Sequence, residues 1–113
     1  MTEPLEGPYF KSSGSAQEAR AGQTVFFQCD VGNLGGNVIS WKNDTSDRII
    51  YAGSVNILND PRLGVENNGR RLRMENVTSH DAGVYVCRVE TYLNPISLMH
   101  RLYVLSKRLL SSS

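Results

Sequence analysis

The residue types of a hydrolytic triad occur together at Ser79, His80 and Asp81. In a working triad, the nucleophile, the base and the orienting carboxylate converge on one another from separate parts of the fold. Three neighbours on one turn cannot converge in this way, so we interpret the run as turn sequence. We therefore expect no catalytic residue in this chain, and no enzymatic activity.

The sequence gives as little support for metal binding or nucleic-acid binding as it gives for catalysis. His80 and His100 have no ligand-type neighbours at metal spacing, whereas a zinc site needs three or four converging groups. We expect neither a metal ion nor another cofactor. The formal net charge is only +1, and a protein without a strongly basic surface is a poor binder of nucleic acid.

The two cysteines, Cys29 and Cys87, are too far apart for a CxxC redox or zinc pair. One long-range disulfide is the economical interpretation, and two free buried thiols are the alternative. A disulfide that closes so long a loop restricts the unfolded chain and would stabilise the fold by about 4 kcal/mol.

Two N-glycosylation sequons are present, beginning at Asn43 and at Asn76. Both fall at the ends of predicted strands, where an attached sugar would be solvated. In a secreted domain we expect Asn43 and Asn76 as glycosylation sites. Ordinary turn chemistry is the alternative for each of them.

The sequence predicts short strands that position the residues named above. Apolar side chains at every second position from 25 to 31, and again at 39 and 41, predict half-buried strands. Asn67-Asn68-Gly69 predicts a tight hairpin, because Asn-Gly supplies the positive φ angles that such a turn needs. Many short strands with frequent turns and no helical period indicate an all-β sandwich. Further strands are expected at 49–52, 55–57, 84–91 and 96–105.

A length of 113 residues suits one domain. We divide the chain into a flexible lead-in at 1–15, which holds an edge strand near 9–11, a domain at 16–105 and a linker or tail at 106–113. No apolar run approaches the roughly 20 residues of a membrane-spanning helix, so we expect no membrane insertion. Residues 1–6 do not resemble a secretory signal, so a signal and an anchor would lie outside this sequence.

Four residues form a family signature. Trp41 follows Cys29 by twelve residues, and Tyr85 stands two residues before Cys87. This pattern resembles the immunoglobulin superfamily. The resemblance implies an immunoglobulin-like antiparallel β-sandwich in which a Cys29–Cys87 disulfide joins two sheets, the indole packs on it and the tyrosine hydroxyl bonds to backbone.

The same resemblance implies a salt bridge between Arg62 and Asp81 across the bottom of the sandwich, with two solvated charges as the alternative. The two short strands predicted between Ile49 and Ile57 are the additional edge strands of variable-type domains. We therefore expect a domain of variable or intermediate type.

A narrower resemblance covers residues of about 17 to 105. Segments 49–53, 60–62 and 87–91 look like the first immunoglobulin domain of the IgLON proteins, lachesin and the Dpr and DIP families, and 94–98 is similar to the Dpr pattern. The resemblance implies an extracellular protein, on the cell surface or secreted. It would pair with another immunoglobulin domain, as a homodimer or heterodimer, through the exposed face of one sheet.

Alternation predicts which residues form that face. If Trp41, Cys87 and Val89 point into the core, their neighbours on the same strands point outward. Tyr51 and Ile49 are the expected anchors of the interface, because an aromatic side chain beside an aliphatic one can bury a large apolar area against a partner. The predicted partner-binding residues on these strands are Val38, Ser40, Lys42, Val86, Arg88 and Glu90, and those on the adjacent edge are Ile49, Tyr51 and Ile57. An extension of the face is predicted at Tyr92, Leu93, Ile96 and Met99, unless a bulge near Pro95 reverses their parity.

Exposed apolar groups mixed with charges suit a protein partner, although apolar groups scattered over a surface are common. Recognition through loops, as in antibody variable domains, is the second functional hypothesis. Loops of that kind are rich in Tyr, Ser and Gly. The loop at 32–36 is small and poor in aromatic residues, which favours the sheet.

Overall fold

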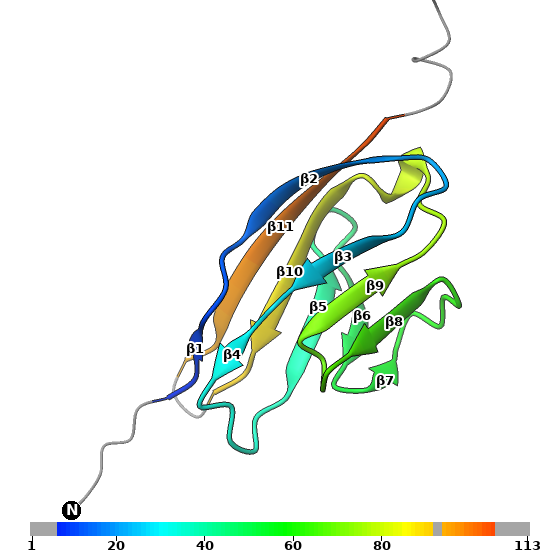
Figure 1. Ribbon diagram of the computed structural model, residues 1–113. Helices are drawn as coiled ribbons and strands as arrows, with labels where there is room; N and C mark the ends of the chain where they lie inside the picture. Colours follow the sequence, from blue (N-terminus) through cyan, green and yellow to red (C-terminus); the bar gives the residue numbers. More distant parts are fainter. Residues whose placement is uncertain (1–6, 92–93, 106–113) are drawn as a thin grey trace, which may run out of the picture.

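The strands lie in two facing layers in the computed structural model, which describes residues 7–91 and 94–105 (Figure 1). One layer is a six-stranded sheet and the other a three-stranded sheet. The six-stranded sheet has the order β2 (Ser15–Arg20), β11 (Ile96–Leu105), β10 (Gly83–Val89), β5 (Ile39–Asn43), β6 (Arg48–Ala52) and β7 (Val55–Asn56). The three-stranded sheet has the order β3 (Val25–Gln28), β9 (Arg71–Met74) and β8 (Leu63–Glu66).

Two small elements complete the fold. β1 (Tyr9–Phe10) pairs with β4 (Val31–Gly32), and a single 3-10 turn, η1 (Ser79–Asp81), precedes β10. The expected hairpin at Asn67-Asn68-Gly69 is confirmed, because it joins β8 to β9 and all three residues have positive φ angles of 56°, 58° and 87°.

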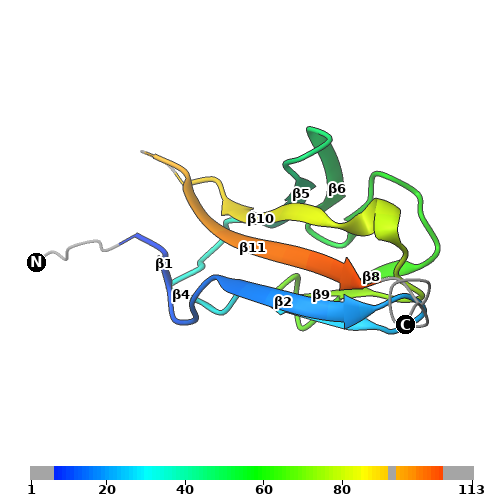
Figure 2. The ribbon, with the colours of Figure 1, turned by 90° about the horizontal axis from the view of Figure 1, so that it is seen from above.

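One strand pair departs from the antiparallel sandwich that we expected. β2 runs parallel to β11, with Ser15 opposite His100 and Arg20 opposite Leu105. Figure 2 shows β2 beside β11 at the edge of the sheet. The chain enters β2 past Gly14, where a Cβ atom would lie 2.3 Å from the carbonyl oxygen of Met99. Only glycine permits the backbone to come so close. Because β2 is parallel to β11 while the other strand pairs of this sheet are antiparallel, the six-stranded sheet is mixed.

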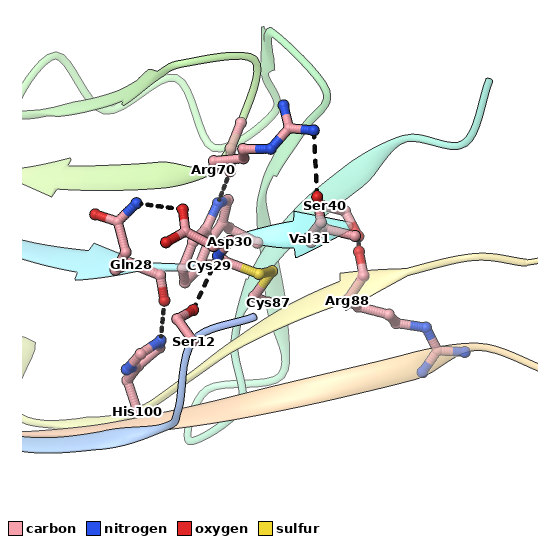
Figure 3. The surroundings of a disulfide bond; sticks show 12 residues. Ser12, Gln28, Cys29, Asp30, Val31, Ser40, Arg70, Cys87, Arg88 and His100 are labelled. Atoms are coloured by element: carbon pink, nitrogen blue, oxygen red, sulfur yellow. Dashed lines mark hydrogen bonds between the residues drawn. A yellow bond between two sulfur atoms is a disulfide. The ribbon is translucent and has the colours of Figure 1, made fainter. Parts of the chain in front are cut away.

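The core between the layers contains the predicted signature. Cys29 and Cys87 are bonded, with their Cα atoms 6.4 Å apart (Figure 3). Trp41 stands opposite Cys87 in the sheet and donates its indole N–H to the Gly69 carbonyl at 2.8 Å. The Tyr85 hydroxyl donates to the Asp81 carbonyl at 2.5 Å. The disulfide and the two aromatic hydrogen bonds thus tie the facing layers and the η1 corner together.

Candidate protein-binding face

The outer surface of β11, β10, β5 and β6, called the outward face below, has an apolar row across its centre. Met99 is opposite Val86, Val86 is opposite Lys42, and Lys42 is opposite Ile49. Residues directly opposite one another on neighbouring strands share a face of the sheet. Met99 and Ile49 are 58% and 51% exposed, so solvent covers large apolar groups at both ends of this row.

The adjacent row is polar. Ser97 is opposite Arg88, and Arg88 is opposite Ser40, whose hydroxyl donates to the Arg88 carbonyl at 3.3 Å. A shallow hollow of about 330 Å³ lies between the two rows. Its lining residues are Ser40, Lys42, Asp47, Ile49, Arg88 and Glu90.

Each cation of the hollow has an anion of its own. Lys42 Nζ lies 2.7 Å from an Asp47 carboxylate oxygen, and Arg88 Nε lies 2.6 Å from a Glu90 carboxylate oxygen. The hydrogen bond with Asp47 raises the pKa of Lys42 and lowers that of Asp47. Exposed pairs of this kind contribute little to stability. Within the hollow they place charges of both signs side by side.

Exposed apolar groups gather on the six-stranded sheet. The described residues include eight exposed large hydrophobic side chains, and six of them lie on strands of this sheet or directly beside them. These six are Val38, Ile49, Val55, Ile57, Met99 and Tyr103. Two of them, Val55 and Tyr103, were not among the predicted residues. Tyr103 has the same parity as Met99 in β11, and this signal could have identified it.

The outer surface of the three-stranded sheet differs in kind. The Arg71 guanidinium lies 4.4 Å from the centre of the Phe26 ring and partly covers it. Glu66 binds Arg71 at 2.7 Å and Arg73 at 3.0 Å, and Arg73 also binds Glu75 at 2.9 Å. This surface is a connected ion-pair network with one shielded aromatic ring. It offers much less exposed apolar area than the outward face.

Residues 8–91 match a family model described as an immunoglobulin domain. The chain belongs to the immunoglobulin family. No curated protein sequence matches this immunoglobulin domain.

Solved structures share its fold. A chain from the crystal structure of Dpr1 IG1 bound to DIP-eta IG1 matches with a TM-score of 0.80 and 24% identity, over 91% of this domain and 100% of that chain. A chain from Dpr2 Ig1-Ig2 in complex with DIP-Theta Ig1-Ig3 matches with a TM-score of 0.80 and 27% identity, over 89% of this domain and 48% of that chain. A chain from the RIG-5 IG1 homodimer matches with a TM-score of 0.76 and 23% identity, over 88% of this domain and 99% of that chain. This domain thus spans about half the length of the two-domain chain in the Dpr2 complex and nearly the whole length of the other two chains.

The placement predicted for Tyr51 is wrong. Tyr51 is 8% exposed, belongs to the core and donates its hydroxyl to the Leu63 carbonyl at 3.3 Å. The register of β5 and β6 shifts between Trp41 and Lys42, so Trp41 pairs with Tyr51 while Lys42 pairs with Ile49. An irregularity of this kind inserts one extra residue, here Ile50, and reverses the alternation beyond it. Of the three residues Ile49, Ile50 and Tyr51, the last two are therefore buried and Ile49 faces outward.

Ile96 also lies on the other side from the one predicted. It packs against the core and stands opposite Val89, which is fully buried. Because opposite residues share a face, the parity of β11 places Ile96 inward and Met99 outward. Tyr92 and Leu93 lie outside the described residues. Of the remaining predicted residues, Val38, Ile49, Ile57, Arg88, Glu90 and Met99 are exposed, and Ser40, Lys42 and Val86 are half-buried.

Ser79, His80 and Asp81 do not form a triad. They are consecutive residues of η1, and the Asp81 carboxylate accepts hydrogen bonds from the Thr78 backbone N–H at 2.8 Å and from Arg62. The His80 side chain is exposed. Among residues 7–91 and 94–105, no group of three or more His, Cys, Asp and Glu side chains is arranged to hold a metal ion. The same residues contain no helix with the length and hydrophobicity that crossing a membrane requires.

The side chains of Arg62 and Asp81 form a two-pronged ion pair. The two guanidinium nitrogens lie 2.8 and 3.0 Å from the two Asp81 oxygens, and Asp60 also binds Arg62 at 3.1 Å. Burial by itself would raise the pKa of Asp81, but the hydrogen bonds from Arg62 and Thr78 outweigh it, so the pKa lies below 3.8. The Asp81 side chain is only 12% exposed, which limits screening by solvent.

We predict that Asp81→Ala lowers the free energy of unfolding by about 1–4 kcal/mol, because it leaves Arg62 half-buried with one carboxylate fewer and removes the η1 cap. Since the folded-state pKa is depressed, the contribution is complete above pH 3.8 and is lost as the pH falls through the folded-state value. Urea unfolding at neutral pH measures the change. Asp47→Ala, which breaks an exposed pair, should stay within about 0.5 kcal/mol of the parent. Equal stability of Asp81→Ala and the parent would contradict the prediction.

The two sequon asparagines differ in their surroundings. The Asn43 side-chain oxygen accepts from the backbone N–H groups of Thr45 at 3.0 Å and Ser46 at 3.1 Å, which forms a turn. Asn76 is exposed and has a positive φ of 51°, next to the fully buried Val77. Glycosylation of Asn43 and of Asn76 stays a prediction.

Proposed function

We propose that this immunoglobulin domain is an extracellular adhesion or recognition module that pairs with another immunoglobulin domain through its outward face. The single observation that carries the proposal is the row formed by Met99, Val86, Lys42 and Ile49. It places exposed apolar groups at the centre of a sheet, where a second flat surface can cover them. Burial of apolar area supplies most of the affinity of such pairs.

Charges beside this row support specificity. The pairs Lys42–Asp47 and Arg88–Glu90 border the apolar groups. A correct partner must meet both signs at the right places, and a wrong partner brings like charges together. Because each of these pairs is neutral as a whole, covering them does not bury an uncompensated charge.

Two further points support the extracellular compartment and the class of partner. Disulfides persist in oxidising, extracellular environments, and this domain contains one between Cys29 and Cys87. The similar solved structures include Dpr1 IG1 bound to DIP-eta IG1 and the RIG-5 IG1 homodimer. Both pairings are between immunoglobulin domains, and both a homophilic and a heterophilic partner are therefore consistent with the proposal.

Binding through the loops has weaker support. A second shallow hollow, of about 300 Å³, lies among the loops at one end of the sandwich. The described residues of its lining include only Leu34, Val38 and Ile39 as large apolar residues, and no aromatic side chain. Loop recognition relies on aromatic anchors, so we favour the sheet.

Substitutions on the two sheets test the proposal. We predict that Ile49→Ala and Met99→Ala each weaken pairing at least fivefold, about 1 kcal/mol, because each removes a large apolar group from the interface centre. Sedimentation velocity across a concentration series measures self-pairing, and surface plasmon resonance measures binding to other immunoglobulin domains. Arg73→Ala is the matched control, since Arg73 lies on the three-stranded sheet.

The control should pair as well as the parent. If Arg73→Ala weakens pairing while Ile49→Ala and Met99→Ala do not, the three-stranded sheet or the loops bind the partner, and the outward face does not.

A further inference from the structure

His100 occupies an unusual place for a histidine. It is 1% exposed and is the one polar or charged residue in the buried core of the described chain. Its ring stacks against two aromatic rings, with centroid distances of 5.1 Å to Phe27 and 5.9 Å to Trp41. It projects from β11 between the two layers, close to the disulfide (Figure 3). The proposed pairing through the outward face makes no use of this side chain.

The hydrogen bonds define which ring nitrogen carries the proton. His100 Nε2 lies 3.0 Å from the Gln28 carbonyl oxygen, which can only accept, so Nε2 must donate. In a neutral ring Nδ1 is then an acceptor, and the Ser15 hydroxyl, 2.7 Å away, donates to it. Gln17 donates to the same Ser15 oxygen at 3.2 Å and to the Phe26 carbonyl at 2.9 Å. One neutral imidazole therefore connects β11 to β3 and to β2.

β2 is held along one edge only. It is the last strand of the six-stranded sheet and pairs only with β11. Ala19 is its only residue in the buried hydrophobic core. A strand with so little buried apolar area opens more easily than the strands inside the sandwich. The Ser15 and Gln17 side-chain contacts near its start supplement its six-residue ladder with β11.

A second proton on His100 would change these contacts. Both ring nitrogens would then be donors, so the Ser15 hydroxyl would have to turn and accept from Nδ1; it could still accept from Gln17, but its own hydrogen would lose its acceptor. The positive charge would be buried beside Phe27 and Trp41 without a carboxylate to balance it. Burial lowers the pKa of His100 below 6.5, and the hydrogen bond to the Gln28 carbonyl opposes this only in part.

The groups that surround the ring give no compensation. They are Ser15 and Gln17 from β2, Gln28 from β3, Trp41 from β5 and Tyr85 opposite it on β10. Burial raises the pKa of Tyr85, so its hydroxyl is neutral here, and it donates to the Asp81 carbonyl. The carboxylate of this network, Asp30, accepts a hydrogen bond from the Gln28 side chain and not from the His100 ring.

We propose that His100 is a proton-sensitive clasp that holds β2 on the six-stranded sheet while it is neutral and releases β2 when it is protonated. The inference goes beyond the proposed pairing function and depends on no partner. A released histidine titrates near 6.5 and the clasped one below it, so release is favoured as the pH falls below about 6.5. Linkage limits the effect of one proton to about tenfold in the opening equilibrium per pH unit.

Native-state hydrogen exchange of the full chain, followed by NMR from pH 7.5 to 5.0, tests the clasp. After correction for the intrinsic pH dependence of exchange, protection of the β2 amides should fall by up to about tenfold per pH unit below 6.5. Protection of the β3 and β9 amides should stay constant. His100→Phe keeps an aromatic ring without a titrating group and should remove the pH dependence, and His80→Phe, at an exposed position, should leave it unchanged.

His100→Gln provides a second test if the Phe variant does not fold, since it retains a donor for the Gln28 carbonyl and does not titrate. Loss of the pH dependence in either folded variant supports the clasp. The proposal is wrong if β2 keeps its protection at pH 5.0, if β2 and β3 lose protection together, or if a His100 variant retains the pH dependence of the parent. None of these readouts requires pairing, so the result is separate from that of the proposed function.

Discussion

Tyr51→Ala should lower the free energy of unfolding by about 3–5 kcal/mol, the range for removing a large aromatic group from a core. Tyr51 is 8% exposed and packs within the core cluster with Trp41 and Ile50. Its replacement leaves a cavity that the β5–β6 irregularity cannot easily close, because the extra residue there is already buried. Urea unfolding with a linear extrapolation measures the loss.

Two neighbouring substitutions separate the causes of this loss. Tyr51→Phe removes only the hydroxyl that donates to the Leu63 carbonyl and should cost about 0.5–1.5 kcal/mol. Ile49→Ala, two residues away but exposed, should change stability by less than about 0.5 kcal/mol while it weakens pairing. If Tyr51→Ala left the melting temperature unchanged and weakened pairing instead, Tyr51 would face a partner and the packing described here would be incorrect.

Alternation alone could not have placed Tyr51 correctly. A period of two predicts side-chain direction only while the register with the neighbouring strand is continuous. The shift between Trp41 and Lys42 has no mark in the local sequence, which contains no glycine or proline at that point. Ile96 is a different case: it and Met99 are three residues apart in one uninterrupted strand, so a period of two allows only one of them to face outward.

The family signature was predictable because its physical constraints are narrow. A disulfide between sheets, an indole on the adjacent strand and a tyrosine that bonds to its own corner require particular spacings, and Cys29, Trp41, Tyr85 and Cys87 satisfy all of them. Lys42, Arg88 and Met99 also lie where alternation predicts, since β10 pairs with β5 and with β11 without a register shift.

His100 shows what a single sequence does not contain. The sequence indicated only that His100 has no ligand-type neighbours at metal spacing. Its partners Ser15 and Gln28 lie 85 and 72 residues away in the chain. The parallel pairing of β2 with β11 brings Ser15 opposite it, and no local pattern indicates such a pairing. Contacts of this kind become visible only when the topology is known.

Removal of the disulfide should have an effect of similar size to that of Tyr51→Ala. Cys29 and Cys87 are separated by 58 residues, and both are fully buried. Closing a loop of that length restricts the unfolded chain by about 4 kcal/mol in the chain-entropy model. Because small domains have a total stability of about 5–15 kcal/mol, the double variant Cys29→Ala, Cys87→Ala should lose a large part of it. Guanidinium unfolding of the parent and the double variant measures the difference.

The state of the thiols provides the matching control. In the folded, unreduced parent, mass spectrometry after treatment with an alkylating reagent should find no modified cysteine. After unfolding in reductant, both cysteines should be modified. A disulfide acts chiefly on the unfolded state, so the folded double variant should keep the Trp41–Gly69 hydrogen bond although it is less stable. The NMR resonance of the Trp41 indole N–H in the folded variant reports this hydrogen bond. Two alkylatable thiols in the folded parent, or equal stability of parent and double variant, would show that the two sheets are held together by packing alone.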